Sequence, residues 1–270
     1  MDERILSSLR SGQCFRFKEK NGIYEGVIDD TLYSLSKDNI ELLETNGVLH
    51  SYFDLDRDYE SIKAYLSSLH PVMKKAIEEY PYIRILRQNR EEVLLSFILS
   101  SCNNISRISL IIERLSKAFG KPIEKTVGFD TSKSDSVGDN LNVYTFPSVS
   151  SISKTTEDTL RSLGLGFRAP FFLNAARSID SGAFDLDKID KMDDTEARSY
   201  LTTLSGIGPK VADCILLFGF ARLSCFPKDV HIKHIMNTYF SGKTEEFFHP
   251  YEGIAEQFLF CLDLYKKDVL

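Results

Sequence analysis

The chain has 270 residues, with 43% hydrophobic and 27% charged side chains, which suffices for one large or two small domains, and no stretch is apolar for long enough to span a bilayer. Its five cysteines are scattered and odd in number, which argues against a disulfide framework, excludes a clustered four-cysteine iron–sulfur loop and favours an intracellular, reducing compartment. The formal net charge of −6 excludes a uniformly basic nucleic-acid binder, so any DNA-binding surface must gather its cations on one face.

Alternating hydrophobic and polar residues predict a small antiparallel β lobe over residues 1–55. Asn21-Gly22 is a typical tight hairpin turn, and Asn46-Gly47 suggests a second one. The strands expected around these turns cover residues 15–18, 23–28, 31–35, 40–44 and 48–53.

From residue 56 onward the hydrophobic spacing lengthens to nearly four residues, which predicts helices. The apolar helical faces fall within residues 62–69, 93–98, 108–115, 156–163, 169–179, 195–204 and 211–218. A polar segment at 126–142 is expected to be a surface excursion. The predicted fold is therefore α+β, with the β lobe followed by a mostly helical, two-lobed body over residues 56–270.

The turn between two of these helices, residues 205–209, is the most informative part of the sequence. Gly206 and Gly208 allow backbone angles that other residues resist, and Pro209 suits the first turn of a helix. The pattern predicts a helix–hairpin–helix over about residues 196–218, at the cleft between the lobes. Its free N–H groups could bind a DNA phosphate, although a tight turn between packed helices has the same pattern.

Lys210 follows this turn directly, where the positive end of the helix dipole disfavours a charged ammonium. Cys214 and Phe218 follow at i+4 and i+8, so they share one stripe of the helix and could form a wall for a flat base. Asp229 is predicted to cap the start of another helix, and capping alone would be an ordinary role for an aspartate there.

Together these residues resemble the helix–hairpin–helix, Gly/Pro…Asp family of DNA glycosylases, and within it the 8-oxoguanine DNA glycosylase/lyase branch. In that family the hairpin lysine attacks the sugar and an aspartate nineteen residues later assists, and Lys210 and Asp229 keep this separation. The resemblance implies that Lys210 and Asp229 are the catalytic pair. It implies no metal and no cofactor.

Four further segments, at residues 11–16, 100–108, 163–169 and 253–260, are similar to family segments that read the lesion, touch the orphaned opposite base, wedge an aromatic into the duplex and finish the base pocket. The implied base pocket consists of Gly12, Cys214, Phe218, Glu256 and Phe260. The implied DNA contacts are Asn104, Arg107, Phe167, Arg168, Gly206, Gly208 and His231.

Two positions depart from the family pattern. Cys102 stands where an asparagine commonly bonds the opposite cytosine, so relaxed selectivity for the opposite base is expected. Glu256 aligns with a pocket glutamine, and Gln257 follows it. Either the carboxylate of Glu256 makes the contact or the register is shifted by one residue.

The resemblance implies a monomeric, bifunctional DNA glycosylase and AP lyase of base excision repair, whose partner is duplex DNA containing 8-oxoguanine. It would flip out and excise the base through a lysine Schiff base, then cleave the strand by β-elimination. It would act in the cytoplasm or nucleoid of a prokaryote, or in the nucleus of a eukaryote. Two alternatives remain: a related glycosylase for another oxidised base, and a non-catalytic helix–hairpin–helix DNA-binding protein.

Overall fold

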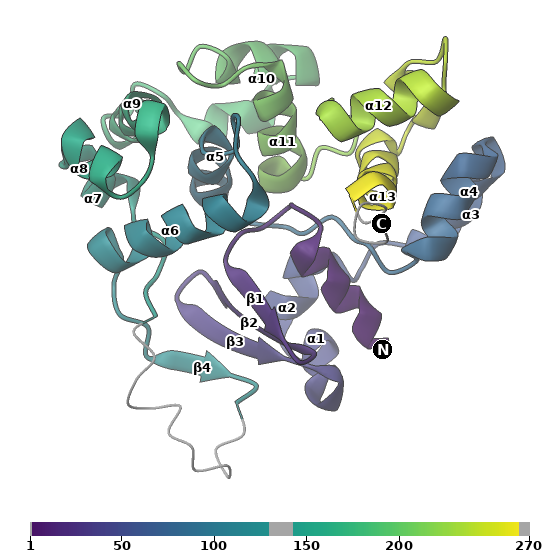
Figure 1. Ribbon diagram of the computed structural model, residues 1–270, viewed down its shortest axis with the longest axis horizontal. Helices are drawn as coiled ribbons and strands as arrows, with labels where there is room; N and C mark the ends of the chain where they lie inside the picture. The colour runs from purple at the N-terminus through teal and green to yellow at the C-terminus, as the bar shows by residue number, and fades with distance from the viewer. Residues whose placement is uncertain (1, 130–142, 265–270) are drawn as a thin grey trace.

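A four-stranded sheet forms the smaller part of the molecule, whose computed structural model describes residues 2–129 and 143–264 (Figure 1). Its strands lie in the order β1 (Phe17–Lys20), β2 (Ile23–Ile28), β3 (Thr31–Leu35) and β4 (Lys125–Val127). The first three are antiparallel neighbours, and β4 pairs parallel with β3. Asn21 and Gly22 turn the chain between β1 and β2 with φ of 54° and 78°, which confirms the predicted hairpin.

The segment after β3 is helical, so the two strands predicted around Asn46-Gly47 are wrong. It contains α1 (Leu42–Thr45) and α2 (Gly47–Tyr52). The side chain of Asn46 caps α2 by accepting hydrogen bonds from the backbone N–H groups of Val48 and Leu49, both at 3.1 Å. Asparagine suits both a turn and a helix cap, and here the cap prevails because the helix buries Leu49 against the sheet.

The polar segment predicted as a surface excursion begins within the sheet, because Lys125–Val127 is β4. Residues 130–142 of that segment lie outside the described residues.

The helical body follows the predicted periodic segments closely. Its helices are α3 (Tyr59–Leu69), α4 (Pro71–Glu79), α5 (Arg90–Ile98), α6 (Ile105–Phe119), α7 (Val149–Ser153), α8 (Glu157–Ser162), α9 (Ala169–Asp180), α10 (Asp194–Leu201), α11 (Pro209–Phe220), α12 (Val230–Tyr239) and α13 (Glu252–Leu264). Short 3₁₀ helices cover Glu3–Arg10, Lys37–Asn39, Gly166–Arg168, Leu186–Lys191 and Glu245–Phe248. The α+β fold class is confirmed.

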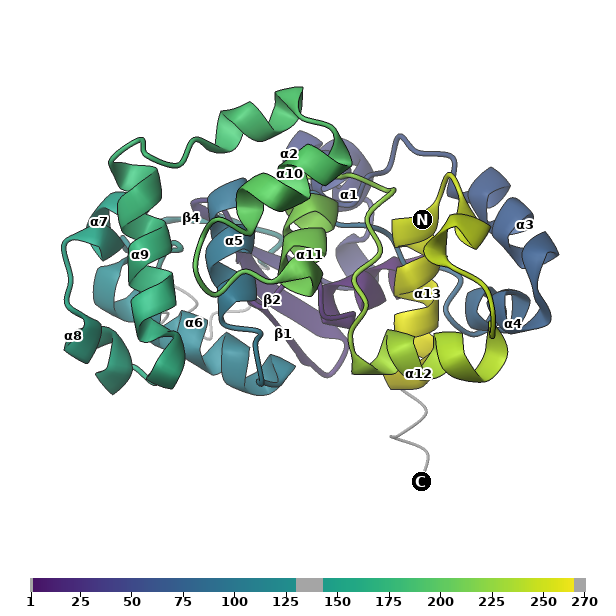
Figure 2. The same ribbon diagram turned by 90° about the horizontal axis from the view of Figure 1, so that it is seen from above.

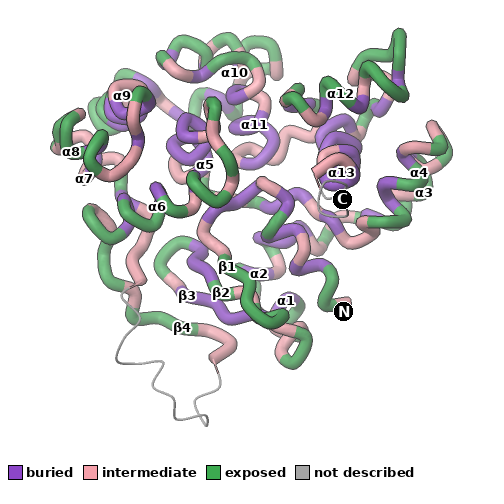
Figure 3. Tube along the Cα trace, in the orientation of Figure 1, coloured by how far each residue is buried: buried purple, intermediate pink, exposed green. Residues whose placement is uncertain are grey.

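Helices α5 and α11 pack together in the middle of the body. Figure 2 shows α7, α8 and α9 on one side of this pair, and α12, α13, α3 and α4 on the other. The buried parts of the chain concentrate along α5, α11 and α13, as Figure 3 shows. The hairpin between α10 and α11 lies at the surface, between these two groups of helices.

Two clusters of buried side chains form the core, one in the helical body and one in the β lobe. Phe15 of the β lobe belongs to the helical cluster, whereas Leu86, between α4 and α5, belongs to the β-lobe cluster. The two parts thus share a packed boundary, and their division at residue 55 stays a prediction. In the described part of the chain, every helix is too short or too polar to cross a membrane.

Candidate active site

The hairpin between α10 and α11 places Lys210 in the first turn of α11, as the sequence predicts. Gly206 has a φ of +91°, and a Cβ there would lie 2.6 Å from the Cβ of Phe171, so only glycine fits. Gly208 caps α11 without a side-chain hydrogen bond and has open space around it. The first N–H groups of α11 are therefore available to an anion such as a phosphate.

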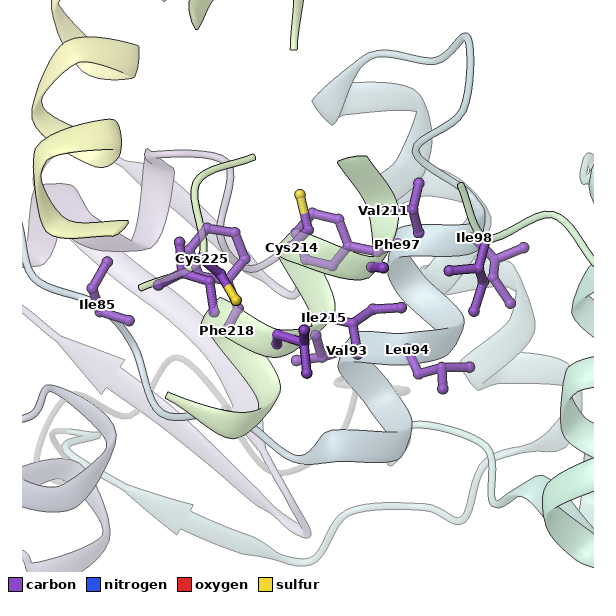
Figure 4. Close-up of a cluster of buried hydrophobic side chains, with 14 of the residues drawn as sticks. Ile85, Val93, Leu94, Phe97, Ile98, Val211, Cys214, Ile215, Phe218 and Cys225 are labelled. Atoms are coloured by element: carbon purple, nitrogen blue, oxygen red, sulfur yellow. The ribbon is translucent and has the colours of Figure 1, made fainter. Parts of the chain in front are cut away.

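Lys210 lies beside a stack of two aromatic rings. Its Nζ lies 5.7 Å from the centre of the Phe97 ring, and Phe97 stacks on Phe218 with ring centres 5.4 Å apart. Figure 4 shows Phe97, Cys214 and Phe218 in the packed interface of α5 and α11. Phe218 is buried in this stack, and its place in the pocket wall stays a prediction.

The charge environment of Lys210 is the reverse of the one expected from its helix position. Burial by itself lowers the pKa of Lys210, but Cys214, Asp229 and Glu256 together outweigh it and raise the pKa above its ordinary value. Burial raises the pKa of the Cys214 thiol to about 12, so Cys214 is neutral near pH 7. The carboxylate of Asp229 is then the main group that favours the ammonium.

Asp229 caps α12, which confirms the predicted cap. Its Oδ1 accepts a hydrogen bond of 2.8 Å from the backbone N–H of Ile232. The cap fixes the carboxylate at the start of α12, within electrostatic range of Lys210. Two helix starts, those of α11 and α12, thus hold the predicted catalytic pair.

Two residues of the predicted base pocket, Gly12 and Phe260, lie together with His231, a predicted DNA contact. Gly12 has a φ of +78°, and a Cβ there would lie 3.2 Å from Cε1 of Phe260. The ring of Phe260 meets that of His231 edge to face, with centres 5.5 Å apart. The Nδ1 atom of His231 lies 2.7 Å from Oδ2 of Asp263, which orients the imidazole. The backbone of the β lobe at Gly12 therefore packs against Phe260 of α13, beside His231 of α12.

Gln13 fixes the backbone around Gly12, a role that the sequence analysis missed. Its buried amide donates to the Arg84 carbonyl at 2.7 Å and accepts from the Leu86 N–H at 2.8 Å. The same amide donates to the hydroxyl of Ser11 at 2.8 Å. The sequence signal for this anchor is the polar Gln13 between Gly12 and the apolar pair Cys14-Phe15.

Glu256 and Gln257 are both buried on α13, one turn before Phe260. Oε2 of Glu256 accepts a hydrogen bond of 2.9 Å from Nε2 of Gln257. Burial raises the pKa of Glu256 to about 8. Glu256 lies within electrostatic range of Lys210 and Cys214.

The side predicted to face the opposite strand combines turns with the start of α6. Phe167 is 52% exposed, as expected for a wedge, and its ring lies under the guanidinium of Arg168 at 4.3 Å. Arg168 itself is buried, and its Nε and Nη2 donate to the carbonyls of Ser101 and Cys102, each at 2.8 Å. Arg168 therefore holds the Cys102 loop, and its contact with DNA stays a prediction.

The start of α6 carries the other two predicted DNA contacts. Asn104 caps α6 by accepting a hydrogen bond of 2.9 Å from the N–H of Arg107, whose side chain is exposed. Arg107 lies close enough to Arg168 to lower its pKa further, after the larger effect of burial. Cys102 is exposed, with a φ of +49°. Arg107 is thus the cation best placed to meet an opposite base.

An open helix–hairpin–helix turn that leads into a half-buried lysine, an aspartate that caps the next helix, and a β lobe packed against α13 are the features of a DNA glycosylase of the helix–hairpin–helix superfamily. Residues 3–94 match the family described as "8-oxoguanine DNA glycosylase, N-terminal domain". The chain is 31% identical to the Clostridium acetobutylicum 8-oxoguanine glycosylase/lyase, solved with duplex DNA containing cytosine opposite 8-oxoguanine (TM-score 0.83; 98% of this chain and 92% of that one).

It is also 35% identical to MBOgg1, solved with a low-affinity DNA ligand (TM-score 0.82; 96% of this chain and 91% of that one). The N-glycosylase/DNA lyase OGG1 of Arabidopsis thaliana is 28% identical over 85% of this chain. The chain spans between 27% and 64% of the length of three curated N-glycosylase/DNA lyase relatives. The chain belongs to the 8-oxoguanine DNA glycosylase/lyase family.

Proposed function

We propose that the chain is a bifunctional DNA N-glycosylase and AP lyase that removes 8-oxoguanine from duplex DNA. The observation that carries this proposal is the placement of Lys210, half-buried at the open start of α11, beside a carboxylate fixed by its own helix cap. The substrate implies that it acts inside the cell, in the cytoplasm or nucleoid of a prokaryote or the nucleus of a eukaryote.

Access to the target requires that the base leave the helical stack. The exposed ring of Phe167 is suited to fill the gap, and Arg107 to bind the orphaned partner base. The flipped base would lie between Cys214 and Phe260. His231, held by Asp263, and the free N–H groups near Gly208 would position the backbone.

In this proposal the backbone carbonyl of Gly12 recognises the oxidised base. Oxidation at C8 places a hydrogen on N7 of guanine, so the lesion offers a donor where the normal base has a lone pair. A fixed carbonyl accepts from that donor and repels the lone pair, and one such contact is worth about 1–3 kcal/mol, about ten- to a hundredfold. The hydrogen bonds of Gln13 hold this carbonyl in place.

The chemistry begins when neutral Lys210 attacks C1′ of the sugar. The Nζ–C1′ bond forms as the glycosidic bond breaks, and the base leaves with the bonding electrons. Loss of a proton from nitrogen and ring opening then give a Schiff base, from which β-elimination expels the 3′ phosphate. Asp229 stabilises the positive charge that develops on the sugar.

An ordinary lysine pKa of about 10.4 leaves only about one molecule in a thousand as the neutral amine near pH 7. Single-turnover excision of 8-oxoguanine, measured from about pH 6 to about pH 9, should therefore accelerate as the pH rises toward that pKa. A rate that falls over this range would contradict attack by a neutral lysine.

A non-catalytic DNA-binding protein would have no need to bury Lys210, because burial of an ammonium has a desolvation cost and an exposed lysine binds phosphate without it. Borohydride trapping on duplexes that contain 8-oxoguanine, guanine or an oxidised pyrimidine separates the candidates. We expect a covalent adduct with 8-oxoguanine. An adduct with the pyrimidine alone supports the related glycosylase, and tight binding without any adduct supports the non-catalytic protein.

A further inference from the structure

The Phe97 ring that lies beside Lys210 is itself held by two other rings. It stacks on Phe218 of α11, with ring centres 5.4 Å apart and planes 20° apart. It also meets the ring of Phe15 edge to face, with centres 5.5 Å apart and planes 66° apart. Each of the three residues is at most 7% exposed. Both arrangements are favoured for aromatic pairs, so the Phe97 ring is fixed by contacts with two separate parts of the fold.

Phe15 comes from the same short segment of the β lobe as Gly12. It follows Gly12 by three residues and precedes β1, yet its ring belongs to the core of the helical body. Between the two, Gln13 is hydrogen-bonded to Arg84 and Leu86. One anchored stretch of backbone therefore carries both the predicted lesion contact and a ring that packs against the aromatic neighbour of the lysine.

The amine of Lys210 needs such a neighbour, because a lysine has a long, flexible stem and attack on C1′ requires a narrow range of approach. Its Nζ atom lies 5.7 Å from the centre of the Phe97 ring, within the range at which an aromatic face attracts an ammonium. Cys214, Asp229 and Glu256 act on the charge of the same amine from α11, α12 and α13. Phe97 adds a contact from α5, which limits where the amine can rest.

On the basis of the proposed function, we propose that Phe15 and Phe97 are positioning residues for the nucleophile: Phe15 fixes the ring of Phe97, and that ring places the amine of Lys210 for attack on C1′. Both act through Lys210 and not on the base. The β lobe then has two roles, because its Gly12 carbonyl recognises the oxidised base and its Phe15 sets the geometry of the attack. Loss of either ring should slow the reaction and leave DNA binding intact.

Two substrates separate this role from recognition of the base. One duplex contains 8-oxoguanine, and the other has an abasic site at the same position, which Lys210 must still attack although no base is present. Single-turnover excision is measured on the first, borohydride-trapped adduct formation on the second, and the Kd on both. Phe15→Leu should slow both reactions by the same factor, about tenfold, and Phe97→Leu by up to about a hundredfold, with each Kd unchanged within about twofold.

A double variant and a matched control make the test specific. Because Phe15 acts through Phe97, adding Phe15→Leu to Phe97→Leu should cost no further rate, whereas independent effects would multiply. Phe53 is buried in the β-lobe core and meets Tyr52 edge to face, with ring centres 5.7 Å apart. Phe53→Leu should therefore lower the thermal unfolding midpoint, as Phe15→Leu does, and keep both wild-type rates. If Phe97→Leu fails to fold, Phe15→Leu and the control still decide on the two substrates.

The outcomes separate this inference from the proposed function. Slower excision of 8-oxoguanine with normal attack on the abasic site would assign Phe15 to base recognition instead. That result, unchanged rates in Phe15→Leu, multiplied losses in the double variant, or equal losses in Phe53→Leu would each overturn the positioning role and leave the proposed function standing. A wild-type protein that attacks neither duplex overturns the proposed function, and the inference falls with it.

Discussion

On the predicted lesion side of the site, Lys210 and Glu256 lie in helices and are held by packing, whereas Cys102 and Phe167, on the side predicted to face the opposite strand, lie in exposed turns. Glu256 is 3% exposed and Phe167 is 52% exposed. On the lesion side, burial and neighbouring charges change the chemistry of Lys210 and Glu256. On the other side, the chain fixes the backbone, through Arg168, and leaves side chains such as Cys102 open to solvent.

Because the two sides differ in burial, we expect them to respond differently to substitution. Changes on the lesion side should affect catalysis, lesion recognition and stability together, because the same groups are packed and hydrogen-bonded. Changes on the opposite-strand side should mainly alter partner-base preference.

The largest effect is expected for Lys210→Gln. Loss of the nucleophile should slow base release by at least about 10⁴-fold, while binding to the lesion duplex persists because the glutamine still fills the space. Single-turnover excision and a binding titration measure the two effects. Lys75→Gln, which changes an exposed lysine on α4, is the matched control and should keep the wild-type rate. A comparable loss in the control would undermine the assignment.

Asp229→Asn should have the next largest effect. The amide can still accept from the Ile232 N–H, so the cap and the thermal unfolding midpoint should be preserved. The sugar loses its counter-charge, which should slow excision by about a hundred- to a thousandfold. Wild-type excision kinetics in this variant would reduce Asp229 to a helix cap.

Gln13→Ala tests whether the Gly12 backbone must be held. The variant leaves the Leu86 N–H and the Arg84 carbonyl without their buried partner, so the free energy of unfolding should fall by about 1–3 kcal/mol for each group. The preference for 8-oxoguanine over guanine should fall by about tenfold. Ser11→Ala removes the hydrogen bond that the Gln13 amide donates to the Ser11 hydroxyl and keeps those to Arg84 and Leu86, so it should do less. Unchanged lesion preference in Gln13→Ala would mean that Gly12 needs no anchor.

The smallest effect concerns the base opposite the lesion. Cys102 lacks the paired donor and acceptor of an amide, so excision rates opposite the four bases should differ by less than about tenfold. Cys102→Asn should sharpen the preference for cytosine without loss of stability, because asparagine tolerates the left-handed backbone at this position. A hundredfold preference in the wild-type protein would show that other groups replace the missing amide.

Features set by neighbouring residues were predicted from the sequence. The turn at Asn21-Gly22, the hairpin before Lys210 and the cap by Asp229 depend on short-range chemistry, and the structure confirms them. Residues 40–53 were misassigned because Asn46 suits both a turn and a cap, and tertiary burial decided between them. β4 was missed because its parallel partner lies far away in the sequence.

Within the candidate site, the sequence indicated which residue types mattered but not their environment. The support of Lys210 by Phe97, the burial of Phe218 and the anchor at Gln13 all depend on contacts between distant segments. The helix position of Lys210 did not give the direction of its pKa shift, because Cys214, Asp229 and Glu256 also act on this amine. The roles of the predicted site residues stay predictions.

The most direct test of the central claim is to locate the covalent bond. Wild-type protein is trapped on an 8-oxoguanine duplex with borohydride and digested, and the modified peptide is sequenced by mass spectrometry. The sugar remnant should be found on Lys210 alone. A remnant on any other lysine, or on the N-terminal amine, would contradict the assignment of Lys210 as the nucleophile.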